Sequence, residues 1–85
     1  MRLDKFLWFV RVVKTRALAQ KLVAEGHLRV DGRPTDRAHH EVRPGMVLSF
    51  PLGERVRVLR IEALPERRGP APEAQACYTD LAPPG

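Results

Sequence analysis

Lys14, Thr15 and Arg16 are the residues whose types and spacing point most directly to chemistry. Thr15 is a favoured helix N-cap, and Gly26 is typical of the position just past a helix end, so a helix is expected between them. A helix start carries about half a positive charge, which two adjacent cations would repel. Since helix starts bind anions, we interpret Lys14 and Arg16 as part of a phosphate site. Two solvated surface cations are the alternative.

A second group of cations surrounds Asp31-Gly32, a pair typical of the turn between two antiparallel strands. His27 and Arg29 alternate with apolar residues and so share one face of an expected strand, while Arg33 follows the turn. If this strand lies beside the helix after Thr15, one continuous basic surface results. Ordinary exposed strand residues are the alternative.

The opening stretch MRLDKFLWFVR contributes the cations Arg2, Lys5 and Arg11 and one acid, Asp4. Asp4 can either cap the first helix or hold a neighbouring cation in position. Trp8 could stack on a base, although a tryptophan in an apolar helix more often belongs to the core.

Neither catalysis nor metal binding is expected from the motifs. His39 and His40 have no carboxylate or thiol at a useful ligand spacing, and a single Cys77 excludes an internal disulfide. The sequence contains no phosphate-cradling glycine loop, no Gly-x-Ser-x-Gly and no suitably spaced carboxylate pair. We therefore expect a non-enzymatic binding module without a cofactor.

The distribution of charge favours a polyanionic partner. Residues 1–45 hold ten Lys/Arg and five Asp/Glu, whereas residues 46–85 hold five of each, so the whole net charge of +5 lies in the first half. Such asymmetry is typical of nucleic-acid binding. With 85 residues we expect one domain. No apolar run approaches the roughly 20 residues of a membrane span, and no secretory signal is recognised, so a cytoplasmic location is expected.

Apolar periodicity predicts two helices in the first third of the chain. The first runs from about Leu3 to Val10 and the second from about Arg16 to Glu25, joined by a tight connection. The second helix is expected to bury Leu18, Ala19, Leu22 and Val23 on one arc and to expose Arg16, Gln20 and Lys21.

Strands are predicted in the middle of the chain. After the turn at residues 31–32 and a loop at 34–45, strands are expected over 46–50 and 55–64, the latter with Val56 and Val58 facing inward, together with Leu59 or Ile61. Residues 65–85 are Pro-rich and expected to form either a tail or one short helix, Pro72 to Leu81, which could dock Tyr78 and Leu81 on the body.

These motifs resemble those of the ribosomal protein S4-like RNA-binding domain. The resemblance rests on RLDKFLW, KTRALAQKLVAEGHLRVDG and RPGMVLSF and covers roughly residues 1–50. With Trp8, the Lys14-Thr15-Arg16 step and the segment ERRGPAPEAQACYTD, the chain is most similar to the ribosome-associated heat-shock protein 15 group.

The resemblance implies an α+β fold of the α-L type, with two N-terminal helices on a small bent antiparallel sheet. From the predicted strands and the Pro-rich end we expect this domain over residues 1–64, followed by the segment 65–85. The resemblance also implies binding of structured RNA. In the heat-shock group the implied partner is ribosomal RNA of the large subunit, in rescue of stalled translation. We expect the chain itself to be a monomer. The implied contact residues are Arg2, Lys5, Arg11, Lys14, Thr15, Arg16, Gln20, Lys21, His27, Arg29, Asp31, Gly32 and Arg33.

The sequence departs from the family at three places. A usual Lys-Pro-Ser step is replaced by Arg37, Ala38 and His39, with Arg37 preserving the charge as a further candidate contact. A usual Gly-Asp step is Gly45-Met46, which predicts the loss of a local turn hydrogen bond. The long basic C-terminal extension of the heat-shock group is not in the sequence, which ends neutral and Pro-rich.

Three other functions stay open on the sequence. A DNA-binding helix-turn-helix regulator would place the second helix in a major groove. An RNA-targeting accessory of an RNA-modifying enzyme would act with a catalytic partner. A protein-interaction module would bind with little sensitivity to salt.

Overall fold

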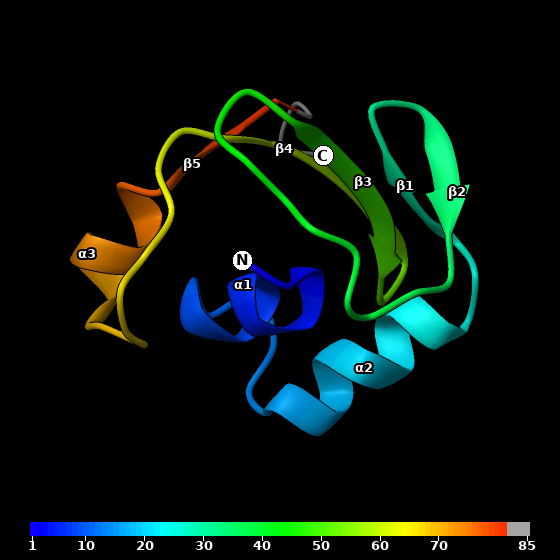
Figure 1. Cartoon of the computed structure of the whole chain (residues 1–85), viewed down its shortest axis with the longest axis horizontal. Helices are drawn as coiled ribbons and strands as arrows, with labels where there is room; N and C mark the ends of the chain where they lie inside the picture. The colour runs from blue at the N-terminus through cyan, green and yellow to red at the C-terminus, as the bar shows by residue number, and fades with distance from the viewer. Residues whose placement is uncertain (82–85) are drawn as a thin grey trace.

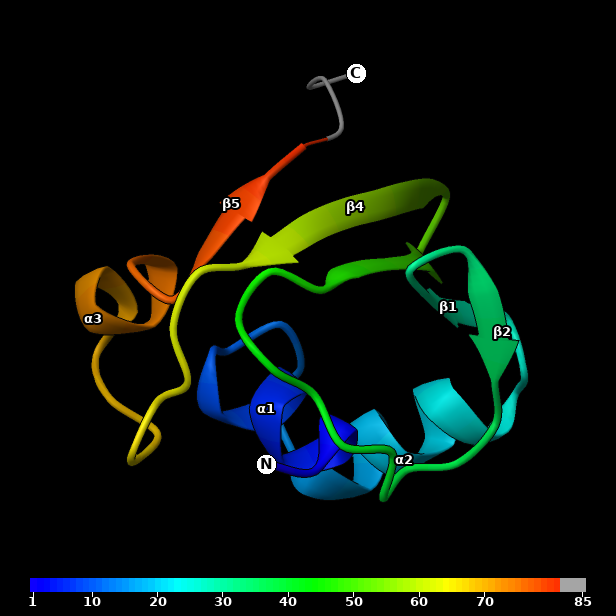
Figure 2. The same ribbon diagram turned by 45° about the horizontal axis from the view of Figure 1, so that its top comes forward.

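Residues 1–81, the part of the chain that the computed structural model describes, form three helices and one five-stranded sheet. All strands are antiparallel, in the order β2-β1-β3-β4-β5, and α1 and α2 cover one face of the sheet (Figure 1; Figure 2). This confirms the expected α+β fold. The elements are α1 (Leu3–Phe9), α2 (Arg16–Ala24), β1 (Leu28–Val30), β2 (Arg33–Thr35), β3 (Val47–Leu52), β4 (Arg55–Ile61), α3 (Ala71–Gln75) and β5 (Tyr78–Asp80).

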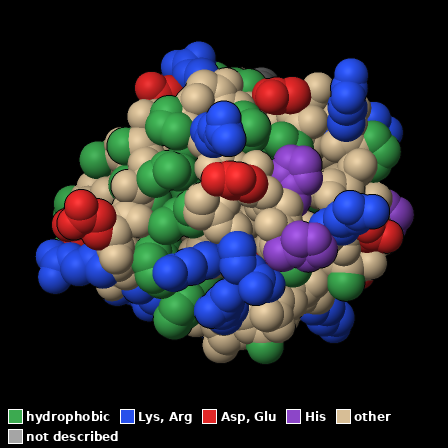
Figure 3. Space-filling view, viewed as in Figure 1, with side chains coloured by type: hydrophobic (Ala, Val, Ile, Leu, Met, Phe, Trp, Pro, Cys, Tyr) green, Lys and Arg blue, Asp and Glu red, His purple; other side chains and the backbone are tan. Residues whose placement is uncertain are grey.

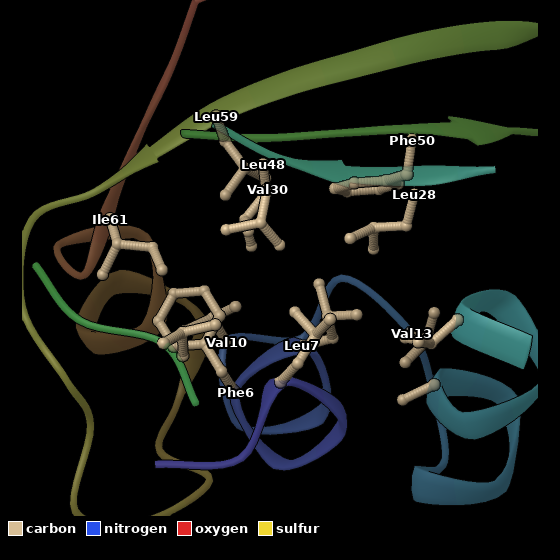
Figure 4. Packing of buried hydrophobic residues seen from close by; sticks show 14 of the residues in the cluster. Phe6, Leu7, Val10, Val13, Leu28, Val30, Leu48, Phe50, Leu59 and Ile61 are labelled. Atoms are coloured by element: carbon tan, nitrogen blue, oxygen red, sulfur yellow. The ribbon is translucent and has the colours of Figure 1, made fainter. Parts of the chain in front are cut away.

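The core lies between α1 and the sheet. Phe6, Leu7 and Val10 recur on one face of α1 and are almost completely buried. They point toward the apolar face of the sheet, where Leu48 and Leu59 project from the paired strands β3 and β4 (Figure 4). This packing fixes α1 rigidly, so the polar residues at its start have a defined position.

The second helix begins where the sequence predicts, but its buried face is rotated. Thr15 caps it, because the Thr15 hydroxyl accepts a hydrogen bond from the Leu18 amide at 3.1 Å. Ala19 and Val23 are fully buried, whereas Leu18 is 46% exposed, so the expectation that Leu18 is buried was wrong. The small Ala19 and Val23 sit against the core, and Leu18 is turned to the flank of the helix.

The turn between β1 and β2 has the geometry that its sequence favours. Asp31 and Gly32 both have positive φ, at 50° and 84°, as a type I′ turn requires. The Asp31 carboxylate also accepts a hydrogen bond from the Val47 amide at 2.8 Å, and the Asp31 amide donates to the Val47 carbonyl at 2.8 Å. The hairpin is thereby attached to the first residue of β3.

The inward face of β4 differs from the expected one. Leu59 and Ile61 are buried, whereas Val56 is 64% exposed and Val58 is only half-buried. Apolar residues occupy both faces of this strand, so its period of two does not decide the orientation. Pairing decides it, because Leu59 lies opposite the buried Leu48 of β3.

Of the two possibilities for residues 65–85, a short helix with Pro72 in its first turn is present, but the expectation that it extends to Leu81 was wrong. Helix α3 ends at Gln75, and β5 pairs with the otherwise free edge of β4, with Tyr78 opposite Ile61. The Leu81 amide extends this pairing by donating to the Val58 carbonyl at 2.8 Å, and the Leu81 side chain stays exposed. Strand pairing satisfies backbone groups that a longer helix would leave open on β4.

The loop before β3 packs on the start of α1. The amides of Leu3 and Asp4 donate to the carbonyls of His40 and Ala38 at 2.8 and 3.0 Å. At the end of the loop the Met46 amide donates to the Arg43 carbonyl at 3.2 Å, so a backbone hydrogen bond closes the turn in which Met46 stands where the family usually has Asp. Within residues 1–81, no helix has the length and apolar character needed to cross a membrane.

Candidate nucleic-acid interface

A buried carboxylate organises the first part of the site. Asp4 has no exposed surface, and its oxygens accept hydrogen bonds from Arg2 (Nε 3.0 Å, Nη2 3.2 Å), Arg16 (Nε 3.4 Å), Gln20 (Nε2 3.1 Å) and the Lys5 amide (2.8 Å). Of the two roles open to Asp4 on the sequence, the structure has the second, since no side chain caps α1. Asp4 therefore joins the start of α1 to the first two turns of α2.

The Asp4 carboxylate stays ionised because the hydrogen bonds that it accepts stabilise the negative charge more than burial destabilises it. Burial alone disfavours the ionised form, but the hydrogen bonds from Arg2, Gln20 and the Lys5 amide lower the pKa of Asp4 below its ordinary value. The negative charge of Asp4 holds the guanidinium groups of Arg2 and Arg16 in place. The two side chains remain exposed, by 47% for Arg2 and 41% for Arg16. Within residues 1–81, Arg16 donates a hydrogen bond only through Nε, which leaves its terminal amino groups for a ligand.

Lys14 and Arg16 lie on different flanks of α2, which refines the interpretation of the helix start. Arg16 turns toward Asp4, so part of its repulsion with the helix dipole is compensated within the protein. Lys14 is exposed and has no ion pair within residues 1–81. Lys14 instead lines a hollow that it shares with Lys21 and His27.

The candidate contact residues form three groups around α2 and the hairpin. The Asp4 group contains Arg2, Arg16 and Gln20. The His27 group lines two adjoining hollows and contains Lys14, Lys21, His27 and Arg29. The loop group, Arg33 and Arg37, lines one hollow between β2 and the loop before β3. Lys and Arg side chains gather over the region of α1 and α2 in the same view of the surface (Figure 3; Figure 1).

Most of the candidate cations lack an acidic partner, as do Arg43, Arg55 and Arg68 outside the three groups, within residues 1–81. Arg57, Arg60 and Arg67 are each matched within 3.2 Å by Asp80, Glu62 and Glu73. By contrast, several candidate cations have no ion pair within residues 1–81: Lys5, Lys14, Lys21, Arg29, Arg33 and Arg37. These six cations therefore carry positive charge that no acidic side chain within residues 1–81 pairs.

Some candidate residues have structural partners. The Thr15 hydroxyl caps α2, and the Asp31 carboxylate holds β3. Arg29 Nη1 donates to the Gly32 carbonyl at 3.2 Å across the turn, which restrains the Arg29 side chain. The Lys5 ammonium lies 5.2 Å from the ring centre of Phe9.

Arg11 lies apart from the three groups. Its Nε donates to the Gly69 carbonyl at 2.6 Å, and Arg68 Nε in turn donates to the Trp8 carbonyl at 3.1 Å. The Arg68 guanidinium also lies 5.8 Å from the Trp8 ring centre. Arg11 and Trp8 therefore connect α1 to the segment before α3.

The central role of Asp4 is what sequence reasoning located least well. A lone acid among cations was the available signal, but the contacts from α2 depend on how the two helices pack. No group of three or more His, Cys, Asp or Glu side chains within residues 1–81 is placed to hold a metal ion.

Comparison with known proteins matches this geometry to a family. The model of the S4 domain matches residues 1–48. The chain is 34% identical over 82 residues to Heat shock protein 15 of Escherichia coli (strain K12), covering 96% of this chain and 61% of that protein. It is 40% identical over 74 residues to small ribosomal subunit protein uS4 of Protochlamydia amoebophila (strain UWE25), covering 85% of this chain and 35% of that protein.

A solved structure agrees with these relatives. The trimeric structure of Vibrio cholerae Heat Shock Protein 15 superimposes with a TM-score of 0.89 at 34% identity, covering 96% of this chain and 82% of that chain. The chain spans 61% of the length of the E. coli relative. Since the family model matches more than half of the residues and the fold agrees, the chain belongs to the S4 domain family, the RNA-binding domain family that its motifs resemble.

Proposed function

We propose that this chain is a non-enzymatic cytoplasmic protein that binds structured RNA, with ribosomal RNA as its main target. The observation that carries the proposal is the set of unpaired cations around α2 and the hairpin, next to Arg2 and Arg16 held by a buried carboxylate. Oriented guanidinium groups and free ammonium groups suit a phosphate backbone, because they combine geometry with charge.

Recognition is expected to follow the shape of the RNA. A-form RNA presents its phosphates and 2′-hydroxyl groups along a wide minor groove, while its major groove is too narrow for side chains to read. The Asp4, His27 and loop groups then contact phosphates on different parts of the backbone.

A role at the large ribosomal subunit in rescue of stalled translation is the specific form of this proposal. It is supported by similarity to proteins named heat shock protein 15 over nearly the whole of this chain. Similarity to small-subunit protein uS4 supports ribosomal RNA as the class of target. Co-sedimentation with separated large and small subunits tests the role, and preference for small subunits would contradict it.

The binding proposal is tested by affinity for structured ribosomal RNA, duplex DNA and single-stranded RNA across a salt series. We expect structured RNA to bind most tightly. The Lys14→Ala/Arg16→Ala variant should bind it more weakly, with a salt slope shallower by about 1.4–1.8 if each cation contacts one phosphate.

A matched control removes the same charge elsewhere. The Arg60→Ala/Arg67→Ala variant loses two cations that are paired with Glu62 and Glu73, so its salt slope should stay near that of the parent. If all three nucleic acids bind equally, or if the two variants have equal salt slopes, the basic groups bind nucleic acid only nonspecifically. Preference for duplex DNA would favour the DNA-binding alternative.

A monomer is the proposed state of the free chain. The related V. cholerae structure is trimeric, so the two states need a direct comparison. Sedimentation equilibrium should give a mass near 9.6 kDa. A mass three times larger would overturn this part of the proposal.

A further inference from the structure

Two hollows meet at His27, and their walls do not resemble a simple phosphate site. The first, of about 500 Å³, lies between α2 and the end of β3 and is lined by the apolar side chains of Leu18, Leu22 and Leu52. The second, of about 460 Å³, is lined by Arg29 and Val56. His27 and Pro51 line both hollows.

Each hollow combines an apolar wall with a cation. Lys14 and Lys21 stand at the first, and Arg29 stands at the second. Leu18 and Val56 are both largely exposed, which leaves apolar surface in water next to unpaired positive charge. Glu25 also lines the first hollow, where it would repel a phosphate but can accept a hydrogen bond from an amino group.

We propose that the two hollows bind an unpaired stretch of the RNA strand, with one base in each hollow against His27 and the neighbouring phosphates at Lys14, Lys21 and Arg29. The proposal rests on the proposed function and names the element of the RNA that this part of the surface reads. Unpaired bases can turn outward, lie on flat or aromatic side chains and bury an apolar face that a paired base keeps in the stack.

The size of the hollows favours a nucleotide over a protein segment. Pockets of about 300–1,000 Å³ suit small-molecule-sized groups, whereas a stable protein interface uses about 20–30 residues on each side. The positive rim also fits a phosphate-bearing ligand. A protein partner is therefore the competing outcome of the test.

The experiment compares two RNA hairpins of the same stem, one fully paired and one with a bulge of two 2-aminopurine nucleotides. The full chain should bind the bulged hairpin at least about fivefold more tightly, the lower end of what one stacked base contributes. The 2-aminopurine fluorescence should change on binding, because the bases move into a new environment.

Five variants separate stacking from charge and from folding. Leu18→Gln and Val56→Gln, which change exposed side chains, should each reduce the preference for the bulge and leave binding of the paired hairpin and its salt slope unchanged. His27→Ala should reduce the preference, whereas His27→Phe, which keeps a flat ring without a charge, should retain it. Leu64→Gln changes an exposed apolar residue outside the hollows and should match the parent.

The outcomes distinguish this inference from the proposed function. If neither hairpin binds, the proposed function fails. If both bind equally, or if His27→Phe loses the preference as His27→Ala does, RNA binding stands and the hollows do not hold bases. If the two hairpins bind equally and Leu18→Gln loses binding to ribosomes, the first hollow binds a protein instead of a base.

Discussion

Replacement of Asp4 by asparagine tests the central contact of the site. Asp4→Asn keeps the size of the side chain but removes the buried negative charge and directs an amide N–H₂ group at donors from Arg2, Arg16 or Gln20. Removing one partner of a buried ion pair costs about 3–5 kcal/mol when the charge left behind is buried. Because Arg2 and Arg16 are nearly half exposed, we expect about 1.5–3 kcal/mol, the contribution of a hydrogen bond to a charged group. That is a large part of the total stability of about 4–13 kcal/mol expected for this length.

The effect should depend on pH in a defined direction. The pKa of Asp4 is lowered in the folded state, so the unfolded state binds more protons at acid pH. The stabilisation is fully present above the unfolded pKa of about 3.9 and is lost as the pH falls through the folded pKa. Asparagine does not titrate at this position, so the difference in stability between parent and variant should narrow at acid pH.

Urea and thermal unfolding, followed by the fluorescence of the single Trp8, measure both effects. At neutral pH the variant should unfold about 6–24 °C lower, given about 4–8 °C per kcal/mol for a domain of this size. Asp36→Asn is the matched control, because Asp36 is exposed and has no ion pair within residues 1–81; it should change stability by less than about 0.5 kcal/mol. Equal stability of Asp4→Asn and the parent at neutral pH, or a difference that does not narrow with acid, would refute the reasoning.

Three further predictions concern other parts of the fold. Gly32→Ala should lower the free energy of unfolding by about 1–2 kcal/mol, because φ at this position is +84°, although a Cβ would meet no atom within 4 Å. Gly32→Asn should lower it by less, since Asn tolerates positive φ better. Equal losses for the two variants in urea titrations would contradict this reasoning. Cys77 should react with iodoacetamide at least about tenfold more slowly than a free thiol at pH 8. The reason is that burial and the nearby Glu73 carboxylate raise the pKa of the thiol. Fast labelling of the folded protein without urea would be inconsistent with this. Asp80→Asn should destabilise the chain by less than about 1 kcal/mol, because its 3.0 Å pair with Arg57 is partly exposed, and a larger loss in the same titration would mean that β5 depends on this pair.

Local sequence determined the elements that carry the site. The cap at Thr15 and the turn at Asp31-Gly32 depend on the backbone preferences of a few adjacent residues, so their positions follow from residue type. The buried face of α1 follows from its period, because Phe6 and Val10 repeat at helical spacing. The family motifs then identified the fold, since they coincide with these same local features.

Tertiary structure decided what local patterns leave open. Val56 and Leu59 are both apolar, and only the register with β3 turns Leu59 inward. Tyr78 and Thr79 favour strands, but a segment as short as 78–80 becomes one because β4 offers an unpaired edge.

The arrangement of the site has the same origin. Lys14 and Arg16 are adjacent in sequence, yet only the packing of α1 on α2 brings Asp4 within reach of Arg16 and leaves Lys14 on the other flank. Residue types therefore determined that the chain has a basic, helix-centred surface. Contacts between residues far apart in sequence decided which cations are held and which are free, because burial and pairing depend on distances that exist only in the folded chain.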